Sequence, residues 1–182
     1  MKKKFTPYII SFSLVIIIAL IGSKFTKNVK SEWYNCIKPE ITPPNWVFPV
    51  AWNIIYFVLA IAIGRSIQQG KTLILIFFLI NLALNSVWTY FFFEKKRIDI
   101  ALGIISFIQI TLFYIFNATK DQTLKYLLYP YYAWVVYAYV LNVLTLSKVK
   151  ECENLREFKD PKQSIRSSIG SKAAITNNNP SS

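Results

Sequence analysis

Aromatic side chains gather where a proline-rich loop meets the second long apolar segment. The six rings between residues 33 and 56 are Trp33, Tyr34, Trp46, Phe48, Trp52 and Tyr56. Flat rings can stack on a flat apolar ligand, and the indole N–H and phenol O–H add hydrogen bonds. An aromatic belt at the membrane interface is the alternative interpretation. It fits Trp33, Tyr34 and Trp46 better than Trp52 and Tyr56, which fall deeper along the predicted helix.

Histidine is absent from the sequence, which excludes several kinds of catalytic and metal site. Ser–His and Cys–His catalysis, His-ligated zinc and the usual imidazole ligand of haem iron all need that side chain. The two cysteines, Cys36 and Cys152, fit neither a disulfide framework nor a metal site. We therefore expect no metal ion and no resident cofactor.

Long apolar runs indicate which elements position these side chains. The chain has 182 residues, 54% of them hydrophobic, collected into runs of membrane-spanning length. The sequence predicts an all-α integral membrane bundle of five transmembrane helices at 5–22, 46–64, 72–93, 98–118 and 124–146, the first retained rather than cleaved. Residues 1–148 form one transmembrane domain, and residues 149–182 are expected to be a polar, disordered tail.

Polar and aromatic residues fall on one face of three of these helices. Such faces turn inward, because an unpaired amide in hydrocarbon is costly. The inward residues are Pro49, Trp52, Asn53, Tyr56, Ala60 and Gly64 in the second helix, Asn81, Asn85, Trp88 and Phe92 in the third, and Tyr131, Trp134, Ala138 and Asn142 in the fifth. Residues 24–45 form a long loop that is expected to act as a lid, with Asn45 as N-cap of the next helix.

Basic residues are distributed unequally between the two predicted sides of the membrane. The formal net charge is +12, and seven Lys and Arg residues fall on the amino-terminal side against fourteen on the other, seven of those in the tail. The positive-inside rule therefore places the first loop and the carboxyl terminus in the cytoplasm. A bridge between Cys36 and Cys152 is not expected in that reducing compartment. The charge favours contact with anionic lipid headgroups, and nucleic acid is not an expected partner.

Three local patterns follow one another along the chain. Residues 33–56 carry Trp33-Tyr34, Lys38-Pro39 and the run PPNWVF at 43–48, followed by Trp52 and Tyr56. Residues 82–88 read LALNSVW with Phe91-Phe92 beyond them, and residues 128–142 contain LYPYYAW, Ala138 and Leu141-Asn142. In this order and on these helices, the patterns resemble those of the TspO/MBR family, which comprises the translocator protein (the peripheral-type benzodiazepine receptor) and the tryptophan-rich sensory proteins.

The resemblance implies a five-helix bundle, a homodimer and a ligand pocket roofed by the first loop. That family binds porphyrins, sterols and isoquinoline carboxamides, so tetrapyrroles (haem included), sterols and membrane lipid are the expected partners, in a bacterial cell membrane or an organelle outer membrane. Carried over by position, the ligand-binding residues are Trp46, Trp52, Tyr56, Asn85, Trp88, Trp134 and Ala138. The small residues Ala19, Ser23, Ala83 and Ser86 would permit the close packing of a dimer.

Departures from the family pattern and one absence rank the candidate functions. Pro49-Val50-Ala51 replaces the family's Gly-Pro-Val, and Val143 replaces a tyrosine of the animal sterol-recognition pattern, which lowers the expectation of sterol binding. No Asp, Glu, Lys or Arg lies in mid-span, which argues against an ion-coupled pump. We rank a sensor or transporter that binds tetrapyrroles first. An enzyme that degrades porphyrin through Trp52 and Trp134, in light or with oxidant, ranks second, and a structural partner protein third.

Overall fold

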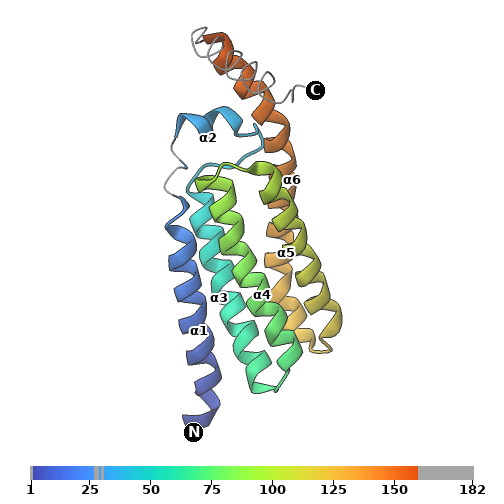
Figure 1. Ribbon diagram of the computed structural model, residues 1–182. Helices are drawn as coiled ribbons and strands as arrows, with labels where there is room; N and C mark the ends of the chain where they lie inside the picture. The colour runs from blue at the N-terminus through green and yellow to red at the C-terminus, as the bar shows by residue number, and fades with distance from the viewer. Residues whose placement is uncertain (1, 27–28, 30, 160–182) are drawn as a thin grey trace, which may run out of the picture.

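The computed structural model describes residues 2–26, 29 and 31–159, and helices make up most of that part (Figure 1). They are α1 (Lys2–Ser23), α2 (Glu32–Ile37), α3 (Val47–Gln68), α4 (Thr72–Thr89), the π-helix η2 (Tyr90–Glu94), α5 (Ile98–Ala118) and α6 (Gln122–Lys159). No strand occurs in these described ranges. Five helical stretches, with α4 and η2 counted as one, are long and apolar enough to cross a membrane. The predicted all-α bundle of five transmembrane helices is thus confirmed.

The five long helices run side by side, and the short helix α2 lies across one end of the bundle, against α6 (Figure 1). Helix α1 packs on α3 and α4, α4 packs on α5, and α6 packs on both α5 and α3. Gly64 lets α1 approach α3 closely, because a Cβ at that position would lie 2.6 Å from Cδ1 of Tyr8. Small residues serve this purpose in membrane bundles, where close packing replaces the hydrophobic effect between helices.

A tightly packed apolar core fills the half of the bundle that is remote from α2. Its side chains come from the carboxyl-terminal parts of α3 and α5 and the amino-terminal parts of α4 and α6, with Leu59, Ile63, Phe78, Leu82, Leu112, Ile115, Leu124 and Leu128 among the most buried. Dense packing at that end leaves little internal space for a ligand. Any large internal space therefore belongs to the other half, beneath α2.

The side chain of Asp121 connects the end of α3 with the start of α6 at the core end of the bundle. Asp121 accepts hydrogen bonds from the Arg65 guanidinium, where Nη2 lies 3.2 Å from Oδ1, and from Gln69 Nε2 at 2.6 Å. Its Oδ1 also accepts from the backbone N–H of Thr123 at 3.0 Å, so the carboxylate caps the start of α6. The Arg65 guanidinium beside it holds the pKa of Asp121 well below the usual carboxyl range. The α3 end and the α5–α6 connection are thereby joined.

Two predicted boundaries are corrected by the structure. Helix α6 continues through Lys159, so the prediction of a disordered tail is wrong for residues 149–159; the rest of that tail, 160–182, lies outside the described residues. Lys, Glu, Leu and Arg beyond residue 147 are good helix formers, so the helix extends past its apolar span. Asn45 is not the N-cap of α3, because that helix begins after Trp46 and no side chain caps it.

The first loop contains more structure than its sequence predicted. Helix α2 forms within it, and Ser31 Oγ caps the helix by accepting a hydrogen bond from the Tyr34 N–H at 3.2 Å. The prediction that Cys36 and Cys152 stay unpaired is wrong, because the structure joins them in a disulfide with Cα atoms 6.0 Å apart. The cause is tertiary: α2 folds against the extension of α6, and neither element was predicted. The bond therefore links the loop to the last helix.

Candidate functional site

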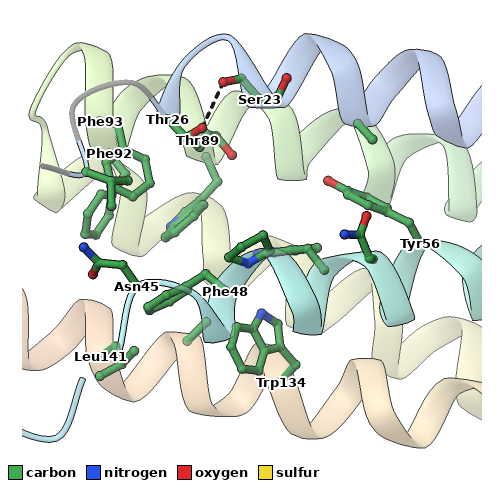
Figure 2. A pocket seen from close by; sticks show the side chains of 18 of the residues that line it. Ser23, Thr26, Asn45, Phe48, Tyr56, Thr89, Phe92, Phe93, Trp134 and Leu141 are labelled. Atoms are coloured by element: carbon green, nitrogen blue, oxygen red, sulfur yellow. Dashed lines mark hydrogen bonds between the residues drawn. The ribbon is translucent and has the colours of Figure 1, made fainter. Parts of the chain in front are cut away.

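A cavity of about 950 Å³ occupies the half of the bundle nearest α2 (Figure 2). Its walls come from α1, α3, α4, η2 and α6, and described residues of the segment 24–46, called loop 1 below, form its roof. The volume lies within the range of sites that enclose small molecules and cofactors. The lining is mostly apolar and aromatic, and the side chains labelled in Figure 2 include Phe48, Tyr56, Phe92, Phe93, Trp134 and Leu141.

Tryptophan and tyrosine rings form much of the wall. Trp52 and Trp134 line the cavity from α3 and α6, and the Trp52 ring lies 5.3 Å from the ring of Tyr56. The Phe48 ring meets the Trp134 ring edge-on at 5.7 Å. Within the described residues, neither Trp52 Nε1 nor Trp134 Nε1 donates a hydrogen bond to the protein. Both indoles can therefore offer a ring face and an N–H donor to a ligand.

The indole of Trp88 is fixed in place by the protein itself. Its Nε1 donates to Asn142 Oδ1 at 3.0 Å, and Asn142 Nδ2 donates to the Ile98 carbonyl at 3.2 Å. These bonds connect α4, α6 and the start of α5. Because its N–H is already used, Trp88 presents a preorganised apolar ring to the cavity rather than a free donor.

The π-helix η2 turns two consecutive phenylalanines toward the cavity. Phe92 and Phe93 are both buried and both line it, with ring centroids 4.7 Å apart. In an α-helix, neighbouring side chains diverge by about 100°, so one of the two would face elsewhere. The wider turn of a π-helix relaxes that constraint, and such turns are frequent at functional sites. The local backbone thus adds aromatic surface at the roof end.

Loop 1 closes the cavity with a mixed polar and apolar surface formed by Tyr34, Pro39, Thr42, Asn45 and Trp46. The Tyr137 hydroxyl donates to the Ile41 carbonyl at 2.8 Å, which holds the roof on α6. Burial raises the pKa of Tyr34, and nearby Tyr137 raises it further, so that phenol stays neutral. Thr42 Oγ1 is buried with no hydrogen-bond partner among the described residues. A polar ligand atom would relieve that cost.

A buried hydrogen-bond network lies between the cavity and the apolar core. Asn85 Nδ2 donates to the Tyr131 hydroxyl at 2.6 Å, and that hydroxyl in turn donates to Asn81 Oδ1. Asn81 Nδ2 donates to Thr111 Oγ1 at 2.7 Å and to a backbone carbonyl of α5. The prediction that both asparagines turn into the protein is confirmed. The ring of Tyr131 lies 6.5 Å from that of Trp52, so the network supports the cavity floor.

The cavity lining consists of apolar, aromatic and uncharged polar side chains. Among the described residues that line it, none is Lys, Arg, Asp or Glu. Across the described ranges, no three His, Cys, Asp or Glu side chains are grouped as metal ligands. Ser23, Thr26 and Asn45 lie at the roof end, and Asn53 and Tyr56 add polar groups deeper along α3 (Figure 2). The cavity therefore combines aromatic surface along its depth with hydrogen-bonding groups at the roof and on α3.

The structure brings six of the seven predicted ligand-binding residues to the cavity. Trp46, Trp52, Tyr56, Trp88, Trp134 and Ala138 line it. Trp46 lies at the rim, since 67% of it remains exposed. Asn85 does not line the cavity and belongs to the network beneath it.

Sequence reasoning missed the contribution of α1 and part of that of η2. Phe12, Val15, Ile16 and Ala19 line one wall, yet α1 has no polar stripe in that region to mark an inward face. The alternation of burial along α1, with Ser11 and Val15 buried, appears only in the folded bundle. The run of three phenylalanines at 91–93 was a signal for η2, but an α-helical period assigns only one of them to the interior.

The fold and the cavity define a class of protein: an integral, multi-pass membrane protein of five helices that encloses a ligand-sized aromatic site beneath its first loop. Comparison with known proteins gives the family. The model of the TspO/MBR family matches residues 11–146, and the chain therefore belongs to that family.

Individual relatives agree with this assignment. The chain is 38% identical over 117 residues to a tryptophan-rich sensory protein of Cereibacter sphaeroides. The aligned stretch covers 61% of this chain and 73% of the relative. It is 33% identical over 141 residues to a tryptophan-rich protein TspO of Archaeoglobus fulgidus, and this alignment covers 72% of the chain and 90% of the relative. It is 26% identical over 139 residues to the human translocator protein, and this alignment covers 67% of the chain and 78% of the relative. The similarity extends over the membrane-spanning part.

Proposed function

We propose that the protein binds a tetrapyrrole in the cavity beneath loop 1 and acts as a sensor or in transport of that ligand. The observation that carries the proposal is the composition of the cavity wall. Four of the five tryptophans of the chain line a space of about 950 Å³, and no charged side chain is among its described lining residues. A flat, apolar macrocycle matches both the size of that space and the stacking surface of its rings.

The distribution of polar groups suggests how such a ligand would be oriented. Carboxylates are costly to bury without partners, so the acidic edge of a porphyrin would lie at the roof rather than deep in the bundle. The roof supplies Asn45 and the unpartnered hydroxyl of Thr42. Lys24 and Lys38 adjoin lining residues along the chain and add positive charge at the rim. The macrocycle itself would then reach Trp52, Tyr56 and Trp134.

A fluorescence titration tests the proposal. Purified full-length protein in detergent is titrated with protoporphyrin, haem and cholesterol in parallel while tryptophan emission is recorded. We expect saturable quenching by the tetrapyrroles, because four of five indoles would lie beside the ligand. Trp52→Phe and Trp134→Phe should each weaken affinity by about 1 kcal/mol, or roughly fivefold, since they keep a ring but remove the indole.

The matched control is Trp33→Phe, because Trp33 is the tryptophan that does not line the cavity and should leave the affinity unchanged. The product is analysed after illumination, so that simple binding is separated from porphyrin breakdown, which Trp52→Phe and Trp134→Phe should suppress more than they weaken binding. Equal affinities for all three variants and the parent protein would place the ligand elsewhere. Saturable binding of cholesterol alone would exclude the tetrapyrrole.

A further inference from the structure

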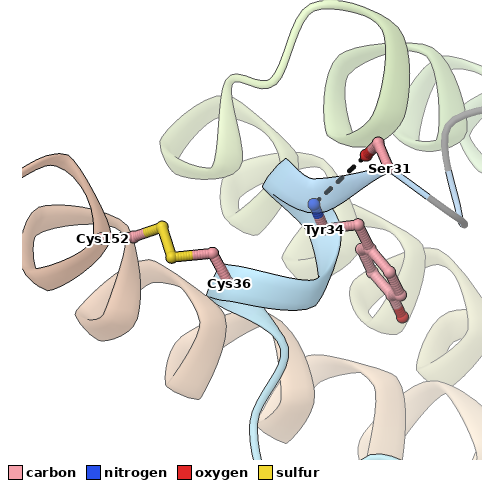
Figure 3. The surroundings of a disulfide bond; sticks show 4 residues. All are labelled: Ser31, Tyr34, Cys36 and Cys152. Carbon is pink, nitrogen blue, oxygen red and sulfur yellow. Dashed lines mark hydrogen bonds between the residues drawn. A yellow bond between two sulfur atoms is a disulfide. The ribbon is translucent and has the colours of Figure 1, made fainter. Parts of the chain in front are cut away.

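The disulfide joins the roof of the cavity to the last helix. Cys36 lies on α2 and Cys152 on the part of α6 that extends beyond residue 147 (Figure 3). Cys36 is exposed, whereas Cys152 is buried, with 4% of its surface accessible. The two ends of the bond therefore differ in access: a reagent in solution reaches the α2 side.

Non-covalent packing also holds α2 in this position, because Tyr34 and Ile37 are buried in an apolar cluster with η2 and Cys152. The rings of α2 make one aromatic contact with η2, between Tyr34 and Phe93 at 5.7 Å, and one cation–π contact, with Lys96 5.2 Å from the Trp33 ring. Beyond α2 the roof has one hydrogen bond to α6, from Tyr137 to the Ile41 carbonyl. All of these contacts are non-covalent and can open together, so within the described residues the disulfide is the covalent attachment of α2 to α6.

The position of α2 determines the position of the roof. Only a short stretch separates Ile37, the last residue of α2, from the cavity-lining residues Pro39 and Thr42. Tyr34 on α2 itself also lines the cavity. A displacement of α2 away from α6 therefore carries part of the cavity lining with it and opens the space below to water.

The charge distribution indicates the compartment in which this bond would form. In the topology predicted from the sequence, fourteen of the twenty-one Lys and Arg residues belong to segments on the α2 side of the membrane, which the positive-inside rule places in the cytoplasm. Disulfides in that compartment are rarely permanent, and those that form are usually transient and sense redox conditions. The pairing of an exposed with a buried cysteine over a ligand cavity fits a reversible bond.

We propose that Cys36 and Cys152 form a reversible thiol–disulfide site that latches loop 1 over the cavity, with dithiol reductants and small disulfides as its reaction partners. The oxidised form holds the roof closed and slows ligand exchange, and the reduced form releases α2 and speeds it. The statement about ligand exchange rests on the proposed tetrapyrrole function. The statement about the latch itself rests only on the bond and its place in the fold.

The reaction is a balanced exchange. A thiolate of a dithiol reductant attacks the exposed Sγ of Cys36, the bond to Cys152 breaks, and Cys152 leaves as a thiolate that takes up a proton. The second thiol of the reductant then attacks the mixed disulfide and frees Cys36. Two electrons and two protons pass to the protein, and the reductant leaves as its own disulfide. Closure is the same sequence in reverse, with a small disulfide as the oxidant.

The first experiment determines whether the bond is reversible in the cell. Free thiols are trapped by acid quenching and alkylation with a maleimide polymer that shifts mobility on a gel, in cells that produce the full chain. We expect both thiols to be labelled during ordinary growth and neither after treatment with diamide, with recovery after the oxidant is removed. A bond that is complete in both conditions is a permanent structural bond and overturns the proposal, and so does a bond that never forms.

The second experiment measures the latch on purified protein in lipid nanodiscs. Hydrogen exchange is followed for residues 31–46 with and without dithiothreitol, together with the dissociation rate of bound protoporphyrin. We expect reduction to speed amide exchange of α2 at least about tenfold, because a local opening then needs only non-covalent contacts to break. Protoporphyrin dissociation should accelerate in parallel. Unchanged hydrogen exchange on reduction overturns the latch.

Two variants serve as controls. Cys36→Ser changes an exposed side chain, so it should fold normally, exchange like the reduced protein and no longer respond to dithiothreitol. Tyr137→Phe removes the hydrogen bond to the roof but keeps the disulfide, so it should stay responsive to reductant. If protoporphyrin fails to bind any form while reduction still speeds exchange of α2, the tetrapyrrole function fails and the latch stands. A Cys36→Ser protein that still responds to reductant contradicts the latch.

Discussion

The phenol of Tyr131 is fully buried, and two amides on α4 hold it there. Asn85 Nδ2 donates to the phenol oxygen, and the phenol O–H donates to Asn81 Oδ1, so the Tyr131 hydroxyl has both a donor and an acceptor as partners. A hydroxyl placed in a membrane interior without such partners is costly. The three side chains therefore act as one unit that fixes the floor beneath Trp52.

At the residue scale we predict that Asn85→Ala destabilises the protein more than it weakens ligand binding. The substitution leaves the Tyr131 hydroxyl without its donor, at a cost of about 1 kcal/mol. The control is Asn117→Ala, because Asn117 is exposed and bonds only to a carbonyl of its own helix at 2.8 Å. Thermal unfolding in detergent, with a parallel protoporphyrin titration, checks both quantities. A large loss of affinity with unchanged stability would show that Asn85 contacts the ligand directly.

At the element scale, the ends of the helices show where sequence reasoning succeeds. Apolar runs predicted the α5 span of 98–118 as it is observed, because the apolar run between Arg97 and Thr119 has the length of a membrane crossing. Helix α2 was missed, since its six residues gain their helical form from the Ser31 cap and from packing on η2 and α6. The inward turn of Phe93 was missed for a related reason. A π-turn has no period that a sequence pattern would reveal.

We predict that the free energy of unfolding depends on pH through the Asp121 carboxylate, at the end of the bundle remote from α2. Its pKa is lowered chiefly by the Arg65 guanidinium, so its contribution to stability is fully present above the ordinary carboxyl pKa of about 4. That contribution is lost as the pH falls through the lowered value. Asp121→Asn should cost about 1 kcal/mol at pH 7, and the difference from the parent protein should shrink below about pH 4.

Thermal unfolding at several pH values measures this effect. The matched control is Asp99→Asn, which removes a carboxylate from an exposed pair with Arg97, 2.7 Å between Nη2 and Oδ2, and should change stability little. A pH profile for Asp121→Asn that runs parallel to that of the parent protein down to pH 3 would contradict the assignment.

At the scale of the whole molecule, the small residues that suggested a dimer have different surroundings. Ala19 and Ser23 line the cavity, and Ser86 lies 3.8 Å from the position of a Cβ on Gly22, within the contact between α1 and α4. Ala83 faces outward. The sequence could predict that small residues permit close approach, but which neighbour approaches depends on the packing of the complete bundle.

We therefore predict that a homodimer would form through the outer face of α4 at Ala83. Ala83→Leu should reduce the dimer that is captured by cross-linking in native membranes, because the longer side chain separates the helices. The control is Gly103→Leu, since Gly103 is also exposed and small but lies on α5 with open space around it. Monomer alone for the parent protein at every expression level would refute the dimer. An equal loss of cross-linked dimer in both variants would show that the interface does not lie at Ala83.

The covalent topology of the oxidised chain separates one wall of the cavity from the others. Residues 36 to 152 form a closed ring that contains α3, α4, η2, α5 and most of α6, whereas α1 precedes the ring. That helix is attached by its connecting loop and by packing, as at Gly64 and Tyr8. A single backbone cut inside the ring would leave both fragments joined, while a cut between α1 and α2 would leave α1 held by non-covalent contacts alone. With the bond intact, a movement of α1 would thus leave the covalent ring unchanged.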